Sequence, residues 1–239
     1  MIEFVSETGS TSADLAARVV EGEHVEEASW LVADRQLAGR GRQGRVWTDG
    51  RGNFMGSTVV RLRSGDPGAH TLSLVAGVAV FAAVAAVAPG LAGLALKWPN
   101  DLLVGDAKLA GILLERSGDA VIVGIGVNLV EAPDVPGRSI TSLDQHRFTI
   151  DRNVFAGALE ESWTRALRGW HDGAWEQLRA DWLARAHPFG TPLTVHGADG
   201  GLLAGTFAGL DNDGALQLQL TSGTRRTIHA GEVDLGHRR

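Results

Sequence analysis

The stretch QLAGRGRQGR, residues 36–45, restricts the choice of fold more than any other part of the chain. Its glycines match G-x-G-x-x-G, the pattern of dinucleotide-binding folds, and Val46 extends the match to the form found in protein kinases. A dinucleotide fold needs a helix that opens inside the glycine run, but residues 34–52 lack helical or strand periodicity. A kinase needs H-R-D and D-F-G farther along, and neither tripeptide occurs in the chain. Both familiar folds are therefore excluded.

The same stretch lies in a long, positively charged loop. Residues 34–52 hold five arginines and two aspartates, in a protein whose net charge is −6: Arg35, Arg40, Arg42, Arg45 and Arg51 against Asp34 and Asp49. Glycine lets the backbone approach a ligand closely, and guanidinium groups bind carboxylates and phosphates with paired hydrogen bonds. The loop suits an anionic ligand, although a solvated surface loop explains the composition equally well.

The composition allows a sizeable globular core. With 44% hydrophobic and 21% charged residues, the 239 residues suffice for one large domain or for a large and a small one. The chain has no cysteine, which excludes disulfides and Cys-based zinc sites, and its eight histidines lack the spacing of metal ligands. The first thirty residues lack the features of a signal peptide, so we expect a cytoplasmic protein. The net charge disfavours nucleic acid or a membrane as partner.

Periodicity predicts an α+β region in which a mixed β-sheet packs against helices. The apolar run at residues 74–88 is shorter than the roughly eighteen residues of a bilayer-spanning helix, so we assign it to a buried helix at residues 70–88. Two more helices are predicted at residues 10–21 and 151–186. Strands are predicted at residues 2–6, 30–33, 53–63, 96–98, 108–115 and 121–128, the last two joined by a hairpin at residues 117–118.

The pattern changes after Pro188 to short alternating strands separated by turn residues. These strands are predicted at residues 192–196, 205–210, 215–220 and 227–230, with turns at Gly200-Gly201 and at residues 211–214. Such a pattern is typical of a small β-barrel or sandwich. We therefore expect a catalytic domain at residues 1–188 and a small β domain at residues 189–239.

Two other segments have the residues of a binding site. Lys97-Trp98-Pro99-Asn100-Asp101 places a cation and short polar side chains at a strand end, and Gly124-Ile125-Gly126-Val127-Asn128 ends another strand with glycines. Only two of the 22 basic residues are lysines, Lys97 and Lys108. In so arginine-rich a chain a lysine marks a position that requires a compact ammonium, although chance explains the two equally well.

Taken together, these segments closely resemble the biotin protein ligases over nearly the whole chain. The resemblance rests on five segments in order: Gly9-Ser10-Thr11-Ser12, residues 36–45, residues 97–101, Lys108-Leu109-Ala110-Gly111-Ile112-Leu113 and residues 124–128. The tail from Gly205 through Gly214-Ala215-Leu216 to Gly231-Glu232-Val233 also resembles the small C-terminal SH3-like domain of that family. The resemblance implies a class II synthetase-like catalytic fold and a C–N bond-forming ligase.

The implied reaction activates biotin with ATP to biotinyl-5′-AMP and transfers biotin to the acceptor lysine of a biotin carboxyl carrier protein, with Mg²⁺ carried by the phosphates. Lys97, Arg40 and Arg42 are the implied catalytic residues. The residues implied to bind biotin are Ser10, Thr11, Ser12, Gln36, Arg40, Gly41, Arg42, Lys97 and Gly111. Those implied around ATP and the adenylate are Arg42, Arg45, Trp47, Lys97, Asn100 and Asn128. The arginine loop of the family is mobile when empty and orders over the ligand.

Two departures from the family pattern matter. Ser12 stands where the family often has Asn, which changes one hydrogen bond to the biotin head group. The first catalytic strand already begins at Ile2, so we expect no DNA-binding domain ahead of it and no transcriptional repression. We expect a monomer or weak homodimer.

Two alternative functions remain. A lipoate or octanoate ligase or transferase has a similar fold and also ends on a carrier lysine, but the arginine loop and residues 97–101 favour biotin. An RNA-binding module that uses the loop as an RGG-like segment is disfavoured, because the chain is acidic and no aromatic residue interrupts the basic stretch before Trp47.

Overall fold

The computed structural model describes residues 1–48, 50–196 and 201–236. Asp49 was counted in the loop charge and Gly200 in one predicted turn, and both lie outside the described residues, as do residues 237–239 at the end of the predicted β domain.

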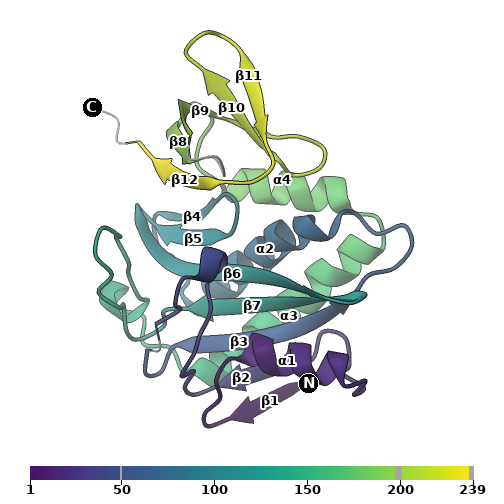
Figure 1. The fold of residues 1–239 in the computed structure, drawn as a ribbon. Helices are drawn as coiled ribbons and strands as arrows, with labels where there is room; N and C mark the ends of the chain where they lie inside the picture. Colours follow the sequence, from purple (N-terminus) through teal and green to yellow (C-terminus); the bar gives the residue numbers. More distant parts are fainter. Residues whose placement is uncertain (49, 197–200, 237–239) are drawn as a thin grey trace.

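Seven strands form one sheet in the order β1-β2-β3-β7-β6-β5-β4 (Figure 1). Only β1 and β2 pair in parallel, so the sheet is mixed as predicted. The strands are β1 (Ile2–Val5), β2 (Trp30–Ala33), β3 (Phe54–Arg61), β4 (Leu94–Lys97), β5 (Asp101–Val104), β6 (Ala107–Ser117) and β7 (Ala120–Val127).

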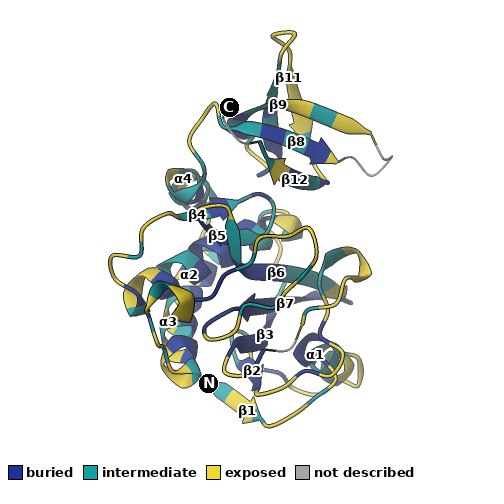
Figure 2. Ribbon diagram, turned by 90° about the vertical axis from the view of Figure 1, so that its left-hand side faces the viewer, coloured by how far each residue is buried: buried dark blue, intermediate teal, exposed yellow. Residues whose placement is uncertain are grey.

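Helices cover both faces of this sheet. On β2, Trp30 and Val32 belong to one apolar cluster and Leu31 to another, because successive side chains of a strand point to opposite faces. The larger cluster is covered by α2 (Leu72–Val87), α3 (Arg152–His171) and α4 (Trp175–Arg185). The smaller one is covered by α1 (Thr11–Val20), and Figure 2 shows α1 on the side of the sheet away from α2 and α3. The α+β prediction is thus confirmed.

The apolar helix α2 is the centre of the larger cluster. Together with the 3₁₀ turn at Ala69–Thr71 it gives a helical segment, Ala69–Val87, whose length and apolar composition would suffice to cross a membrane. Yet 61% of its apolar window is buried inside the protein, between the sheet and the helices α3 and α4. Its composition is therefore that of a core helix.

The structure differs from the predicted elements in several places. The expected helix at residues 151–186 is two helices, because the chain turns at Gly173, whose φ of 83° does not continue a helix. Strands β5 and β12 (Glu232–Leu235), each four residues long, were not predicted. The turn between β6 and β7 falls at residues 118–119, one position later than expected, with Gly118 at a φ of 62°.

The C-terminal region is a five-stranded antiparallel sheet in the order β11-β10-β9-β8-β12. Its other strands are β8 (Pro192–His196), β9 (Leu202–Leu210), β10 (Leu216–Leu220) and β11 (Arg225–Ile228). The turn between β9 and β10 contacts the larger region, where the Trp98 indole donates to the Gly214 carbonyl at 3.1 Å and the Trp175 indole to the Asn212 carbonyl at 2.6 Å. The sheet therefore lies against β4, β5 and α4 (Figure 1).

Trp163→Ala is expected to cost about 3–5 kcal/mol of unfolding free energy, because it removes a fully buried indole and leaves a cavity. Trp163 packs edge-to-face on Trp30, with ring centroids 6.2 Å apart, and so joins α3 to the sheet. Urea denaturation followed by circular dichroism measures the loss. The control on the same helix is Val154→Ala, an exposed position where a change within about 0.5 kcal/mol is expected. A loss below about 1 kcal/mol at Trp163 would contradict this packing role.

Candidate active site

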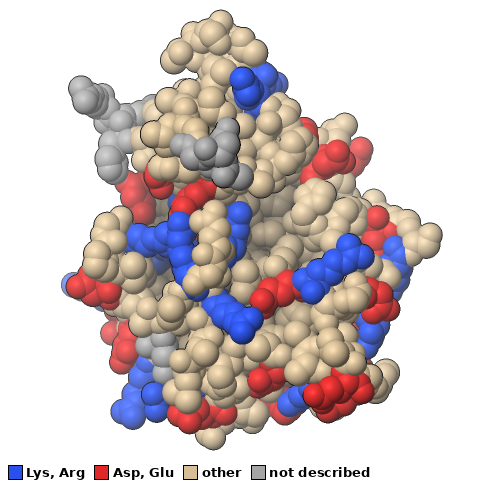
Figure 3. Space-filling model, in the orientation of Figure 1, with Lys and Arg blue, Asp and Glu red and all other residues tan. Residues whose placement is uncertain are grey.

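The sheet face next to α1 bears a cavity of about 480 Å³. Its walls come from the start of α1, the arginine loop, the strands β3, β6 and β7, the segment between β4 and β5, residues 128–140 and β12. Figure 3 shows Lys and Arg side chains beside the hollow in this face of the molecule. All of the residues predicted for the site line this one cavity: Ser10, Thr11, Ser12, Gln36, Arg40, Gly41, Arg42, Arg45, Trp47, Lys97, Asn100, Gly111 and Asn128.

One end of the cavity is a buried network of neutral hydroxyl and amide groups. The Gln36 Oε1 accepts hydrogen bonds from the Thr11 backbone N–H at 2.8 Å and from the Thr11 hydroxyl at 3.1 Å. The Ser57 hydroxyl pairs with those of Thr11 and Ser12, at 2.7 and 2.9 Å. Ser10 accepts from Ala13 N at 3.5 Å and caps α1. Hydroxyls both donate and accept, so this end suits a neutral polar group.

Sequence reasoning missed Ser57, although its signal was present as a polar residue within an apolar strand. Gly124, where the sequence predicted that a ligand comes near the backbone, lies opposite the network on β7. A Cβ at Gly124 would lie 2.6 Å from Ser12 Oγ, so a side chain at this position would push the Ser12 hydroxyl out of the network. The position thus sets the depth of the neutral end of the cavity.

The arginine loop is folded over the cavity by a few specific bonds. It contains a short 3₁₀ turn, Arg42–Gly44, and an antiparallel bridge between Arg40 and Val46, so it is not wholly irregular. Arg42 holds it to both parts of the protein, donating to Asn100 Oδ1 at 3.0 Å and to the Gly231 carbonyl at 3.4 Å. Burial lowers the pKa of the Arg42 guanidinium, and the nearby Asp101 carboxylate opposes this effect.

Trp47 covers the middle of the cavity by packing directly on backbone. A Cβ at Gly126 would lie 2.3 Å from the indole ring, and one at Gly111 would lie 3.0 Å from it. Gly126 must therefore be glycine for the ring to lie on β7 as it does, whereas a side chain at Gly111 would require the ring and Lys108 to shift slightly. The ring is also 5.9 Å from Lys108 Nζ, within the range of a cation–π contact. The Trp47 indole nitrogen is buried and has no hydrogen-bond partner among the described residues.

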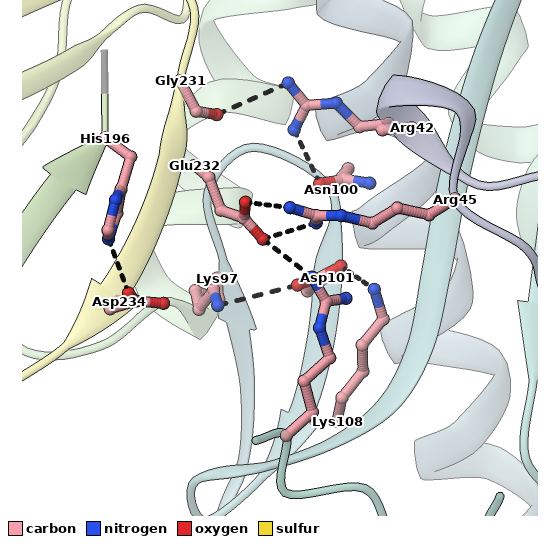
Figure 4. Close-up of polar contacts among 11 residues, drawn as sticks. Arg42, Arg45, Lys97, Asn100, Asp101, Lys108, His196, Gly231, Glu232 and Asp234 are labelled. Atoms are coloured by element: carbon pink, nitrogen blue, oxygen red, sulfur yellow. Dashed lines mark hydrogen bonds and ion pairs between the residues drawn. The ribbon is translucent and has the colours of Figure 1, made fainter. Parts of the chain in front are cut away.

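The two lysines of the chain meet at one carboxylate. Lys97 ends β4 and Asp101 begins β5, where the two residues are register partners across the hairpin. Lys97 Nζ lies 3.7 Å from one oxygen of Asp101, and Lys108 Nζ lies 2.5 Å from the other (Figure 4). Neither Asp101 nor Lys108 was predicted as a site residue, though the scarcity of lysine had marked Lys108 as unusual. Asp101 holds two ammonium groups that could otherwise bind a ligand anion.

The side-chain amides of Asn100 and Asn128 form hydrogen bonds with other residues of the protein. The Asn100 side chain donates to the Ile112 carbonyl at 2.7 Å while its oxygen accepts from Arg42. Asn128 donates to the Thr141 carbonyl at 3.1 Å and accepts from Asn53 at 3.4 Å. Each asparagine therefore ties one wall of the cavity to the next.

The C-terminal sheet closes the cavity through Glu232 at the start of β12. Arg45 donates to both carboxylate oxygens, with the Nη1–Oε1 bond at 2.5 Å, and Arg138 donates to Oε1 at 3.2 Å. Arg45 is the main cause that lowers the pKa of the Glu232 carboxyl from 4.5 to about 2, with smaller contributions from Arg138 and Lys97. Sequence reasoning missed Glu232 and Arg138 as site residues, because their contacts join distant parts of the chain.

The Glu232 carboxylate predicts an acid-sensitive contact between the two regions. Because its pKa is lower in the folded protein, its contribution to stability is present above about pH 4.5 and is lost as the pH falls toward about 2. We expect the difference in melting temperature between the unmodified protein and Glu232→Gln to shrink across that window. Thermal unfolding at a series of pH values measures it, and a constant difference down to pH ~2.5 would contradict the lowered pKa.

A metal site built from protein side chains is not seen at this cavity. Across residues 1–48, 50–196 and 201–236 there is no group of three or more His, Cys, Asp or Glu side chains placed to hold a metal ion. What the cavity offers is a neutral polar end, a cationic middle and a flat aromatic cover. This combination suits a ligand with a neutral polar head, a central acid group and a ring system.

Comparison with known proteins identifies this architecture. Residues 8–128 match the Biotin/lipoate A/B protein ligase family, and residues 194–236 match the Biotin protein ligase C terminal domain. A biotin–[acetyl-CoA-carboxylase] ligase of Paracoccus denitrificans is 37% identical, covering 98% of this chain and 100% of that protein. One of Mycobacterium tuberculosis is also 37% identical, covering 97% and 88%. The biotin protein ligase of Aquifex aeolicus in complex with biotin and ATP superposes with a TM-score of 0.84 at 26% identity, covering 99% of both chains.

Proposed function

The chain belongs to the biotin/lipoate A/B protein ligase family as a biotin protein ligase, and we propose on that basis that it activates biotin with ATP and transfers it to a carrier lysine. The observation that carries the proposal is the convergence of the arginine loop, Lys97 and the hydroxyl network of Thr11 on one cavity. The neutral head of biotin would occupy the hydroxyl end, and its carboxylate would reach the cationic middle.

The lipoate and octanoate alternative is not retained, because relatives that are 37% identical over nearly the whole chain are biotin ligases. The RNA-binding alternative is not retained either, since the chain belongs to an enzyme family.

The first half-reaction joins two anions. An oxygen of the biotin carboxylate attacks the α-phosphorus of ATP, a P–O bond forms, and the bond to pyrophosphate breaks to leave biotinyl-5′-AMP. Such an attack needs the charge on both partners to be screened. Lys97, Arg40 and Arg42 line the cavity where they would do so. Binding of the ligand would replace the contact of Asp101 with Lys97 by a contact with the substrate's own anion.

The second half-reaction passes the biotinyl group to an amine. The neutral amine of a lysine attacks the carbonyl of the mixed anhydride, AMP leaves and an amide forms. Before that step the anhydride must be kept from water. The closed arginine loop, held by Arg42 to Asn100 and Gly231, would provide this cover.

Several finer points complete the proposal. The acceptor is the carrier protein of a biotin-dependent carboxylase, in keeping with the names of the relatives. Mg²⁺ enters with ATP, bound mainly by its phosphates, and neutralises part of their charge. The enzyme acts in the cytoplasm as a monomer or weak homodimer, and residues 1–188 and 189–239 form its two domains.

Mass spectrometry of a carboxylase carrier domain tests the proposed function. The carrier is incubated with the protein, ATP, Mg²⁺ and either biotin or lipoate. A gain of one biotinyl group on one lysine, with no lipoyl product, is the expected result. A carrier domain whose acceptor lysine is changed to arginine is the control, and an unmodified carrier in every reaction would refute the assignment.

A further inference from the structure

Arg138 lies in the segment between β7 and α3 and lines the cavity, but the reaction described above gives it no role. Its guanidinium shares one oxygen with that of Arg45: both donate to Oε1 of Glu232, at 3.2 and 2.5 Å. Two guanidinium groups from distant segments thus converge on a single oxyanion. This arrangement is an anion-binding site that a carboxylate of the protein itself occupies.

The carboxylate in this site is replaceable. The side chains of Arg138, Arg45 and Glu232 are 38%, 41% and 34% exposed, so solvent and salt screen the ion pairs among them. A phosphate group has the same oxygen geometry toward a guanidinium and carries more charge than a carboxylate. A nucleotide phosphate that enters the cavity can therefore compete with Glu232 for the two guanidinium groups.

In the structure, the anion bound by Arg45 and Arg138 is the Glu232 carboxylate. Six cationic side chains and two carboxylates line the cavity, and four of the cations contact the carboxylates: Asp101 contacts Lys97 and Lys108, and Glu232 contacts Arg45 and Arg138. In the proposed reaction Lys97, Arg40 and Arg42 screen the attacking carboxylate and the α-phosphate. The β- and γ-phosphates carry the remaining charge of ATP, and they leave together as pyrophosphate.

We propose that Arg138, together with Arg45, binds the β- and γ-phosphates of ATP during biotin activation, in the place that the Glu232 carboxylate takes in the structure. This inference rests on the proposed function. No bond forms to Arg138: when the P–O bond to the α-phosphorus breaks, the electron pair leaves with pyrophosphate, and the two guanidinium groups balance its charge. Glu232 then competes with the nucleotide instead of assisting its binding.

Arg138→Gln tests the role, because Gln keeps a polar side chain but removes the charge. We expect the KM for ATP in biotin-dependent pyrophosphate exchange, and the inhibition constant of inorganic pyrophosphate, to rise about 10- to 100-fold. The Kd of biotin, measured by calorimetry, and the transfer rate from preformed biotinyl-5′-AMP should not change, since neither ligand has these phosphates. Arg165→Gln is the matched control, because Arg165 pairs with Glu161 on the exposed face of α3.

Glu232→Gln separates phosphate binding from a purely structural role. If Arg138 binds phosphate, this variant loses the competing carboxylate and its KM for ATP falls, opposite in sign to the effect of Arg138→Gln. If Arg138 only holds Glu232 in place, both variants shift the KM in the same direction and pyrophosphate inhibition is unaltered, which overturns the proposal. If the unmodified protein catalyses the exchange and Arg138→Gln has the same KM for ATP, the proposal is also overturned. If the unmodified protein catalyses no exchange, the proposed function itself is overturned.

Discussion

Lys97→Ala is expected to lower the rate of biotin-dependent exchange of labelled pyrophosphate into ATP by about 10²–10³-fold or more, while the protein stays folded. Lys97 ends β4, lines the cavity and has a side chain that is only 18% exposed. In this partly desolvated place its charge acts on the carboxylate and the α-phosphate more strongly than it would in water. Its loss leaves Arg40 and Arg42 alone to offset the repulsion between the two anions during the attack.

The fold should tolerate the change because Asp101 keeps a second cationic partner, Lys108, at 2.5 Å. Circular dichroism and the melting temperature check this point. Lys97→Arg is an informative companion, since it keeps the charge but replaces a compact ammonium by a planar group that needs more room. We expect it to retain part of the exchange activity. Normal exchange in Lys97→Ala would remove Lys97 from the chemistry.

The larger elements of the fold were predictable because local pattern determines them. Strands β3 and β7 are apolar runs bounded by turn residues, and α2 is an apolar run that ends at Pro89-Gly90. Strand β5 (DLLV) is as short as the predicted β2 (WLVA), but it follows directly on a proline turn and begins with the charged Asp101, so it lacks the fully apolar run that marked β2. The break between α3 and α4 had a signal in Gly173, but the helical composition on both sides outweighed a single glycine.

The site was predictable to the extent that its residues lie in contiguous motifs. The arginine loop and the segment that begins at Lys97 each carry several site residues, and the structure brings both to one cavity. Glu232 and Arg138 could not be found in this way, because neither stands in a local pattern that indicates a ligand. Their role depends on how the C-terminal sheet lies on the loop, and tertiary structure alone determines that contact.

The anchoring of the arginine loop by Arg42 leads to the second large expected effect. Arg42→Gly removes two hydrogen bonds from a charged donor, to Asn100 and to the Gly231 carbonyl, and adds backbone freedom to a loop already rich in glycine. Such bonds contribute about 1.5–3 kcal/mol each, so the closed loop should lose roughly 10²–10⁴-fold in population relative to the open loop. Biotinyl-5′-AMP would then escape before a carrier arrives.

Labelling of bystander proteins measures this escape. When Arg42→Gly is incubated with biotin, ATP, Mg²⁺ and a protein that is not a carrier, we expect biotin on many of its exposed lysines, because free biotinyl-5′-AMP acylates amines without selection. Gln43→Gly is the matched control: Gln43 is exposed and has a φ of 58°, which glycine adopts readily, so this change adds flexibility to the same loop without removing an anchor. Bystander labelling by both variants would assign the leak to loop flexibility, and carrier-only labelling by Arg42→Gly would refute the sealing role. Labelling by Arg42→Gly alone shows that the two bonds of one guanidinium keep the adenylate from solvent.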